Sequence, residues 1–444
     1  MARQTGKRMR RRALEHMLRF MARAVIARHK PLVVGVTGSV GKSSTKEAIA
    51  LVLSSSMCVR KSEGNFNNEI GVPLTVLGVD SGGSSFLRWF SIGFRFLRLI
   101  LFPAKYPEVL VLEMGVDRPG DMEYLLGFVP VRIGVVTRIA ESHIAYFGSI
   151  GNIAKEKGRM IFRLPEDGFA ILNLDDPLVS KMAEKTKGMV LSYGFGKDAL
   201  VRADNASFQE TPVGVGFSFK LNYDGKSIPV RLPHVVARHH ISDALAGAAV
   251  GIALEMNLFE IARSLEQLTP LPGRLRFLRG KRGIGILDDT YNASPASVRA
   301  ALATLGEIPA RRRVVIFGDM LELGAMSEEE HRKLADDVVV SGTELAILVG
   351  KRMHLLGEEL LARGMPRGSV MFVPDPDAAT LPLQSILREG DLVLVKGSRG
   401  MRMEKVTEAL LADPAEARKH LCCQSPDWRS RPFLPPAEWD VPAV

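Results

Sequence analysis

The chain has 444 residues, of which 46% are hydrophobic and 24% are charged, a composition typical of soluble globular proteins with two or three domains. Glycine and proline are spread along the whole length, which excludes collagen-like, low-complexity and largely disordered chains. Ten basic residues and one acid give residues 1–30 a charge of +9, out of +10 for the whole chain. Because the remainder is nearly neutral, a globally basic nucleic-acid binder is disfavoured, and we expect no nucleic-acid partner.

The first predicted element is a basic amphipathic helix within residues 1–30. Its apolar residues recur at helical spacing, at Leu14, Met17, Leu18, Met21 and Val25. Arginines interrupt the apolar run that a signal peptide would need, so we expect the segment to stay on the chain. Two interpretations stay open: the helix docks on the following domain, or it lies on a membrane surface.

Short apolar runs alternate with helical stretches from Pro31 onward, the pattern of parallel strands joined by crossover helices. A helix is expected over Lys46–Leu53. Buried strands are expected at Leu32–Val36, Val109–Glu113, Ile133–Thr137 and Phe169–Asn173. Each strand ends in polar residues, where an open α/β sheet binds its ligands. We interpret residues 31–272 as one nucleotide-binding domain with a mostly parallel sheet and a β-rich stretch over 190–232.

Residues 84–103 form an insertion in this domain that is rich in Phe, Leu and Ile. Arg88, Ser91, Arg95 and Arg98 share one face of the predicted helix. The run is short and its arginines would be costly at membrane depth, so a spanning helix is disfavoured. Two interpretations stay open here too: an interfacial helix on an anionic leaflet, or a helix packed on this domain or on a partner.

A second α/β unit, Rossmann-like, is predicted over residues 273–412. Its strands are expected at Gly283–Leu287, Arg313–Phe317, Leu345–Val349 and Leu392–Val395. From Asp413 to the end at residue 444 the sequence is proline-rich, and we expect a peripheral, poorly ordered tail. The chain has three cysteines, Cys58, Cys422 and Cys423. They are too few for a disulfide framework and lack zinc-site spacing, which fits a cytoplasmic protein.

The glycine-rich turn of residues 35–44 reads Gly-Val-Thr-Gly-Ser-Val-Gly-Lys-Ser-Ser and lies between a predicted strand and a predicted helix. Glycines let backbone N–H groups approach a phosphate, Lys42 adds a positive charge, and Ser43 can ligate Mg²⁺. Val36 stands where the strict P-loop spacing has glycine. We predict an ATP-binding loop, and hence a P-loop-type ATPase domain. The loop residues are Thr37, Gly38, Ser39, Val40, Gly41, Lys42, Ser43 and Ser44.

Further motifs follow the loop in a fixed order. They are Glu63–Thr75 (EGNFNNEIGVPLT), Leu112–Gly115 (LEMG), Ser142-His143 with Phe147–Ser149, Ala154–Gly158 (AKEKG), Leu271–Arg274 (LPGR), Leu287–Ala293 (LDDTYNA), Gly318–Gly324 (GDMLELG) and Lys396–Arg399 (KGSR). With this ordered set the chain resembles the ATP-dependent Mur ligases over about residues 31–410. The Asn-Asn-Glu-Ile-Gly-Val-Pro-Leu-Thr stretch resembles the branch that adds D-alanyl-D-alanine to a UDP-N-acetylmuramoyl tripeptide.

The resemblance implies an enzyme that moves the ATP γ-phosphate onto a carboxylate and lets an amine displace it, with Mg²⁺ to balance the charge. It implies Ser43, Glu113 and His143 as metal ligands. Lys157 resembles the lysine that the family carbamylates into a further Mg²⁺ ligand, and Lys155 is the competing candidate. The expected catalytic residues are Lys42, His143, Lys157 and Arg274.

The resemblance also assigns roles in the C-terminal unit. Arg274 resembles an arginine that reaches the γ-phosphate when the domains close, Asp289 resembles a ribose-contacting acid, and Asn292 and Tyr291 would lie beside the nucleotide. The expected substrate-binding residues are Asn67, Asn68, Thr75, Asp319, Lys396, Ser398 and Arg399, with Glu322 in the same cleft as Asp319. For Lys396–Arg399 a solvated turn is the alternative.

The sequence departs from the family at two places. The phosphate loop begins about 35 residues into the chain, where the family has a whole UDP-binding domain before it, so recognition of the UDP moiety is in doubt. The adenine-contacting stretch has His240 and Asp243 in place of two asparagines. Asp243 offers only acceptors to adenine, whereas an amide offers a donor as well.

Three hypotheses follow. The first is a monomeric cytoplasmic ligase that acts on small-molecule substrates, a muramoyl peptide precursor and D-alanyl-D-alanine, with peripheral membrane contact through residues 1–30 and 84–103. The second is a related ligase with another acyl substrate, of polyglutamate or cyanophycin type. The third is a nucleotide-binding scaffold without catalysis at the membrane, which the retention of Lys42, Glu113, His143 and Lys157 disfavours.

Overall fold

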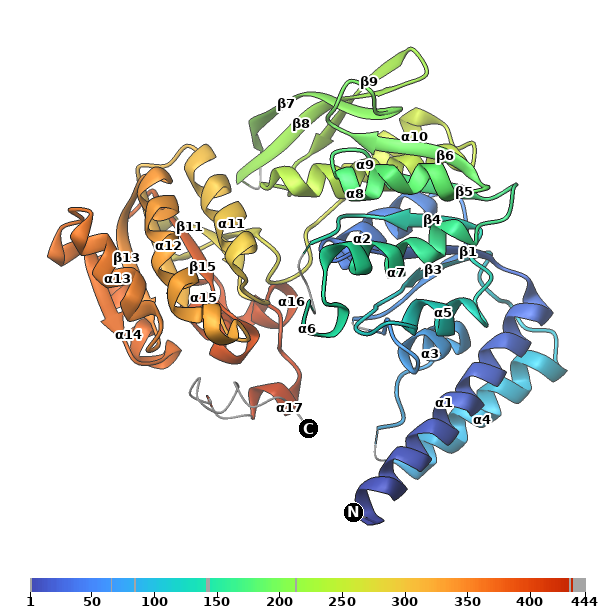
Figure 1. Cartoon of the computed structure of the whole chain (residues 1–444). Coiled ribbons are helices and arrows are strands. Elements are labelled where there is room, and N and C mark those ends of the chain that lie inside the picture. Colours follow the sequence, from blue (N-terminus) through green and yellow to red (C-terminus); the bar gives the residue numbers. More distant parts are fainter. Residues whose placement is uncertain are drawn as a thin grey trace. The chain divides into compact units, whose positions relative to one another are not determined.

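The computed structural model describes residues 2–64, 66–83, 85–140, 144–211, 214–430 and 433 (Figure 1). The chain separates into two compact units. The first consists of Met1–Ala206, Ser218–Arg231 and His239–Leu268, and the second of Ser207–Phe217, Leu232–Arg238 and Thr269–Val444. His143 and Asn65, both part of the motifs above, lie outside the described residues.

A nine-stranded sheet organises the first unit. Its strands, in the order β2-β3-β1-β4-β5-β6-β7-β8-β9, are β2 (Val59–Lys61), β3 (Val109–Glu113), β1 (Leu32–Thr37), β4 (Ile133–Val136), β5 (Phe169–Asn173), β6 (Met189–Gly194), β7 (Val201–Thr211), β8 (Gly214–Tyr223) and β9 (Lys226–Leu232). Neighbours from β2 to β7 pair in parallel. The mostly parallel sheet and its four predicted buried strands are therefore confirmed, with boundaries within a residue.

Helices follow the strands and bury their apolar faces on the sheet. They are α2 (Lys42–Leu53), α3 (Gly71–Leu77), α5 (Asp121–Leu126), α6 (Ile144–Phe147), α7 (Ile150–Phe162), α8 (Pro177–Ser180), α9 (Arg238–Ala253) and α10 (Leu258–Leu265). Ser149 caps α7 by accepting a hydrogen bond from the Asn152 N–H, which satisfies a donor that the first turn leaves unpaired. Along this part of the chain strands and helices alternate, and the polar carboxyl ends of the strands lead into the loops that precede the helices.

Two further helices, α1 (Ala2–His29) and α4 (Phe86–Leu101), lie side by side in the first unit (Figure 1). Leu18 and Val25 of α1 are buried in the same apolar cluster as Ile92 and Leu99 of α4. One face of each helix is therefore docked on the domain, as the packed interpretation of each segment requires. Among the described residues, no helix combines the length and the apolarity needed to cross a bilayer.

The second unit has a six-stranded sheet in the order β10-β11-β15-β12-β13-β14. Its elements are β10 (Arg276–Arg279), β11 (Gly285–Asp289), α11 (Pro295–Glu307), β12 (Arg312–Gly318), α12 (Ser327–Val340), β13 (Thr343–Val349), α13 (Met353–Ala362), β14 (Val370–Val373), α14 (Pro376–Ile386), β15 (Asp391–Lys396) and α15 (Glu404–Leu410). Only the β10–β11 pair is antiparallel. Along β12, Val315 and Phe317 enter one apolar cluster and Val314 and Ile316 the other, so helices cover both faces.

The expectation of a peripheral tail from Asp413 is wrong for residues 413–430. This segment forms α16 (Ala417–His420) and α17 (Pro426–Arg429). Ala417 and Leu421 are buried in one of the apolar clusters of the second unit. Their spacing of four residues places both on one side of a helical turn, so this short segment docks despite its prolines and charges.

Candidate active site

The phosphate loop joins the end of β1 to the start of α2. Two of its glycines have left-handed backbones, Gly38 with φ 150° and Gly41 with φ 87°. A Cβ at Gly38 would lie 2.0 Å from the Oγ1 atom of Thr137, so only glycine fits there. The Ser39 N–H donates to the Arg138 carbonyl (2.6 Å), which ties the loop to the segment after β4. These contacts therefore fix the backbone conformation of the loop.

Positive charge and backbone donors meet in this loop. The Lys42 ammonium donates to the carbonyls of Gly38 (2.9 Å) and Ser39 (3.3 Å) and so lies across the loop. Gly41 is the N-cap of α2 and has no side chain to bond the first-turn amides. Those amides, the helix dipole and Lys42 together form the setting that favours a phosphate. The other predicted loop residues, including Ser43 and Ser44, sit around the same turn.

The buried carboxylate of Asp243 positions the helix that follows the phosphate loop. Asp243 of α9 accepts hydrogen bonds from the Thr45 hydroxyl of α2 (2.6 Å) and from the His240 ring at 3.1 Å. Its side chain is 5% exposed. Both carboxylate oxygens thus have partners within the protein, and Asp243 positions the start of α2. Contact of Asp243 with adenine stays a prediction.

We expect Thr45→Val to lower the free energy of unfolding by ~1–3 kcal/mol, because it removes a donor from the buried Asp243 carboxylate while keeping the side-chain shape. Urea unfolding followed by circular dichroism measures the change. Thr380→Val is the matched control, since that hydroxyl donates only to a carbonyl of its own helix, at Asp377. Equal effects of the two variants would contradict the supporting role of Thr45.

Glu113 ends β3 beside the phosphate loop, since Val36 of β1 pairs with it in register. Its side chain is 2% exposed. Oε1 accepts a hydrogen bond from the Asn67 amide (3.0 Å), whereas Oε2 accepts none and lies 3.7 Å from the Lys46 ammonium. A buried carboxylate oxygen without a donor suits a hard cation such as Mg²⁺. Within the described residues no set of three or more His, Cys, Asp and Glu side chains is gathered for a metal, and the expected ligand His143 lies outside them.

Lys157 projects from α7 into the interior and is 2% exposed. Burial, and secondarily the nearby Lys42 charge, lower the pKa of Lys157 to about 7. The neutral amine is therefore populated at neutral pH, unlike that of an ordinary lysine. The adjacent Glu156 instead accepts from the N–H groups of Gly120 (2.9 Å) and Met122 (3.2 Å) and holds the start of α5. The competing candidate, Lys155, is exposed.

Of the three substrate-binding residues expected in the first unit, one lies at the site. Asn67 contacts Glu113, as described. The side-chain oxygen of Asn68 accepts from the N–H groups of Ile70 (3.2 Å) and Gly71 (3.0 Å), just before α3 begins. Thr75 is 5% exposed, and its hydroxyl donates to the Gly71 carbonyl inside the helix (3.0 Å); its expected contact with substrate stays a prediction.

In the second unit, cationic and aromatic side chains stack in a row. The Arg274 guanidinium lies 4.0 Å from the centre of the Tyr291 ring, and that of Arg399 lies 5.4 Å from the same ring. Arg399 also lies 4.7 Å from the Trp428 ring. The aromatic faces hold two arginines close together despite their like charge, and such a pair suits an anionic ligand.

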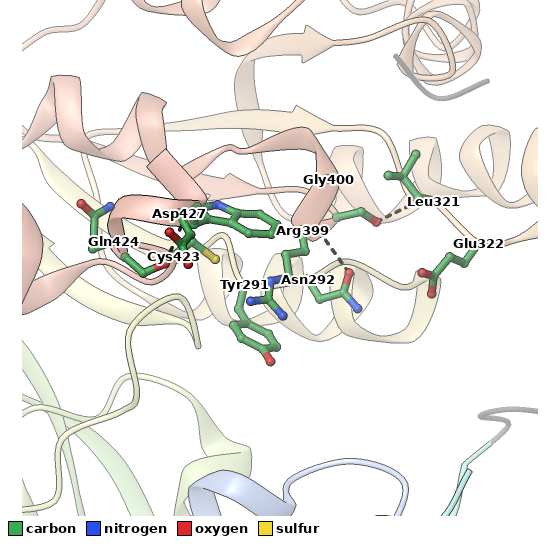
Figure 2. Close-up of a pocket in the computed structure, with 12 residues that line it drawn as sticks. Tyr291, Asn292, Leu321, Glu322, Arg399, Gly400, Cys423, Gln424 and Asp427 are labelled. Carbon is green, nitrogen blue, oxygen red and sulfur yellow. Dashed lines mark hydrogen bonds between the residues drawn. The ribbon is translucent and has the colours of Figure 1, made fainter. Parts of the chain in front are cut away.

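This row borders a cavity of about 750 Å³, shown in Figure 2. Its lining residues are Tyr291, Asn292, Leu321, Glu322, Ser398, Arg399, Gly400, Cys423, Gln424, Ser425, Asp427 and Trp428. Asn292, Ser398, Arg399 and Glu322 were expected here or nearby, and the structure brings them together. Sequence reasoning missed the residues from Cys423 to Trp428, for which a tryptophan in a short segment otherwise poor in apolar residues was the available signal.

Lys396 is not among the residues that line this cavity, and its expected contact with substrate stays a prediction. It is 2% exposed and donates to Asp289 (2.6 Å) and to the Asn292 carbonyl (2.9 Å). Burial lowers the pKa of Lys396, and the Asp289 carboxylate opposes that effect. Asp289 also accepts from the Leu275 N–H (3.1 Å), so both of its oxygens have partners. Its proposed contact with ribose stays a prediction.

Asp319 is likewise fully buried and does not face the cavity. It accepts hydrogen bonds from the N–H groups of Arg352 (3.1 Å) and Met353 (2.9 Å), at the start of α13. Burial raises the pKa of Asp319 to about 6. Its Oδ2 atom has no hydrogen-bond partner in the described part of the chain, and its expected contact with substrate stays a prediction. Ser398, whose N–H donates to the Asp319 carbonyl, accepts from the Leu321 N–H (2.8 Å) and anchors the cavity wall.

Comparison with known proteins finds two family models in this chain. The Mur ligase middle domain matches residues 36–87 and 94–251, and the Mur ligase glutamate ligase domain matches residues 273–399. The UDP-N-acetylmuramoyl-tripeptide--D-alanyl-D-alanine ligase of Escherichia coli (strain K12) is 32% identical over 383 residues, which are 85% of this chain and 76% of that enzyme. The enzyme of the same name from Bacillus subtilis (strain 168) is 29% identical, over 89% and 79% of the two chains.

Solved structures agree with the sequence matches. MurF ligase from Thermotoga maritima, solved in complex with ADP, superposes with a TM-score of 0.72 and 25% identity, over 91% of this chain and 84% of that chain. MurF from Acinetobacter baumannii gives a TM-score of 0.72 and 25% identity, over 88% and 79%. With its phosphate loop, its two sheets and these matches across most of its length, the chain belongs to the Mur ligase family.

Proposed function

We propose that this protein is an ATP-dependent ligase that joins D-alanyl-D-alanine to a UDP-N-acetylmuramoyl tripeptide. The observation that carries the proposal is the phosphate loop with Glu113 and Lys157 in the same unit, in a chain about 30% identical to ligases of that name. The loop would bind the ATP phosphates. The carboxylate of the tripeptide would receive the γ-phosphate, and the amine of the dipeptide would then displace it.

We further propose Ser43, Glu113, Lys157 and His143 as the residues that hold Mg²⁺, which would neutralise the charge that collects between a triphosphate and a carboxylate. The Oε2 atom of Glu113, which accepts no hydrogen bond and lies 3.7 Å from the Lys46 ammonium, supports this assignment. A lysine with a pKa near 7 can react as the neutral amine with CO₂, which replaces its positive charge by a carboxylate. Arg274 and Asn292 are proposed as nucleotide contacts, and Arg399 and Ser398 as neighbours of the dipeptide.

Phosphate release by the purified chain with Mg-ATP tests the proposal, with mass detection of the product. We expect turnover only when UDP-muramoyl tripeptide and D-alanyl-D-alanine are both present, with a pentapeptide product. ATP binding without stimulation by either substrate would overturn the acyl-substrate assignment. Turnover with a polyglutamate or cyanophycin-type acceptor in its place would establish the alternative activity. ATP binding combined with full biological function of a Lys157→Ala variant would point to a non-catalytic scaffold.

The location and the oligomeric state also belong to the proposal. A cytoplasmic setting is supported by the unpaired thiols of Cys58, Cys422 and Cys423. A monomeric state is also part of the proposal. Light scattering coupled to gel filtration tests that state.

A further inference from the structure

The outward side of α4 carries a continuous row of large apolar side chains. The exposed residues are Phe86, Leu87, Phe90, Phe94, Leu97, Leu101 and the following Phe102. Their exposed fractions run from 50% for Leu97 to 81% for Phe86. At about 100° per residue, the six within the helix fall in an arc of about 100°. We call this row the α4 outer face, and a patch of this kind marks a surface with a binding partner.

The side chains of the α4 outer face do not supply the buried contacts that attach this helix to the domain. Ile92 and Leu99 point the other way and supply the buried contacts of the helix. The His29 ring of α1 bonds the Leu99 carbonyl (3.0 Å), and the Phe20 and Phe96 rings lie 6.3 Å apart. Phe20 is itself 67% exposed. The exposed apolar surface therefore extends from α4 onto α1, whose opposite face is packed on the domain. Figure 1 shows the two helices running side by side.

The positive charge around the α4 outer face favours an anionic partner. No acidic residue lies between Asp80 and Glu108, whereas four basic residues do: Arg88, Arg95, Arg98 and Lys105. Arg88 and Arg98 are exposed; Arg98 lies about 20° and Arg88 about 100° beyond the edge of the apolar arc. The neighbouring α1 segment adds a net charge of +9. A second copy of this chain would bring the same positive charge against itself, whereas an anionic bilayer complements both the arginines and the apolar row.

We propose that the α4 outer face docks on an anionic lipid bilayer, with the basic residues of α1 adding long-range attraction. The apolar row would enter the boundary between headgroups and acyl chains, and Arg98, next to the row, would stay at the lipid phosphates. With 16 residues, α4 is about 24 Å long, shorter than the ~30 Å hydrocarbon core, so it lies on the membrane. The match to the middle-domain family model breaks at residues 88–93, within this helix, and that break includes Phe90 of the outer face.

Vesicle co-sedimentation tests the proposal with the full chain. We expect binding to phosphatidylglycerol–phosphatidylcholine vesicles that weakens with salt, and little binding to phosphatidylcholine alone. The double variant Phe90→Ser/Phe94→Ser should lose at least about tenfold in affinity, because two exposed aromatic side chains no longer enter the lipid. Phe259→Ser is the matched control: Phe259 is 71% exposed on α10, away from this face, and its loss should change nothing.

A charge variant provides an independent measurement. Arg88→Gln/Arg98→Gln keeps the apolar row and should weaken binding to anionic vesicles by about fivefold per charge at low salt. Unchanged thermal midpoints would show that all variants fold. Failure of the wild type to sediment, or equal binding by the wild type and the Phe90/Phe94 variant, would overturn the proposal. So would a dimer in solution that the Phe90/Phe94 variant abolishes. Turnover with water-soluble substrates is expected to be the same in these variants, which separates this test from that of the ligase activity.

Discussion

Lys42→Met is expected to lower ATP-dependent turnover by ~10²–10³-fold, because it removes a cation placed where phosphate charge develops. In the structure, the Lys42 ammonium lies over the loop carbonyls of Gly38 and Ser39. Methionine keeps the length of the side chain and its packing without the charge. Steady-state phosphate release measures the effect, and calorimetric titration with Mg-ATP separates binding from chemistry.

The matched control for this variant is Lys61→Met. Lys61 is a half-exposed lysine of the same unit that pairs with Glu47 and has no place in the loop. Its replacement should leave turnover within about twofold, as expected for an exposed ion pair of small energetic value. A Lys42→Met protein with wild-type turnover would remove the phosphate-binding role from this loop.

Lys157→Met should lower turnover at least ~10²-fold, since even the loss of an outer-shell partner of a metal site costs 10–100-fold. The residue is buried, so methionine also tests whether packing alone explains its position. The modification itself is measured by ¹³C NMR after adding ¹³C-labelled bicarbonate. A carbamate signal is expected in the wild type and not in Lys157→Met.

The pH dependence of that signal follows from the pKa. Because the pKa of Lys157 is lowered to about 7, the reactive neutral amine increases as pH rises through 7. At a fixed CO₂ concentration, carbamate should therefore increase between about pH 6 and 8, whereas an ordinary lysine would need a pH above 10. The free energy of unfolding changes in the same direction. The unfolded chain binds more protons than the native one between about pH 7 and 10, so stability rises with pH there. A carbamate signal that first appears above pH 9 would contradict the low pKa.

Much of the architecture could be predicted because its signals are local. The buried strand at Val109–Glu113 is a continuous apolar run, and the phosphate loop has its glycines in a fixed spacing. The edge strand β2 (Val59–Lys61) was missed because two of its three residues are basic, and the four-residue β14 is too short to show a period. Long apolar periodicity therefore decides which elements a sequence reveals.

The burial of Lys396 and of Thr75 could not be predicted from the sequence, for two different reasons. Lys396 looks like a solvated turn residue, but the β11–β15 register places it opposite Asp289, 107 residues earlier, and the two neutralise one another inside the fold. Thr75 belongs to a motif that resembles a substrate site, yet its hydroxyl is used by its own helix. No local sequence pattern shows that such polar residues are buried, because burial depends on which strand or helix lies next to them.

The hydrogen bond between Thr45 and Asp243 has a consequence for synthesis of the protein. It joins the helix that begins at the phosphate loop to a residue 198 positions later in the chain. The strands that surround the loop are also brought together from distant segments, as the Thr37–Met114 bond shows. Such non-local contacts form late in folding, because the intervening chain must first be ordered. On the ribosome, a nascent chain would therefore gain its complete nucleotide-binding loop only after Asp243 has emerged, although the loop itself is made long before that residue.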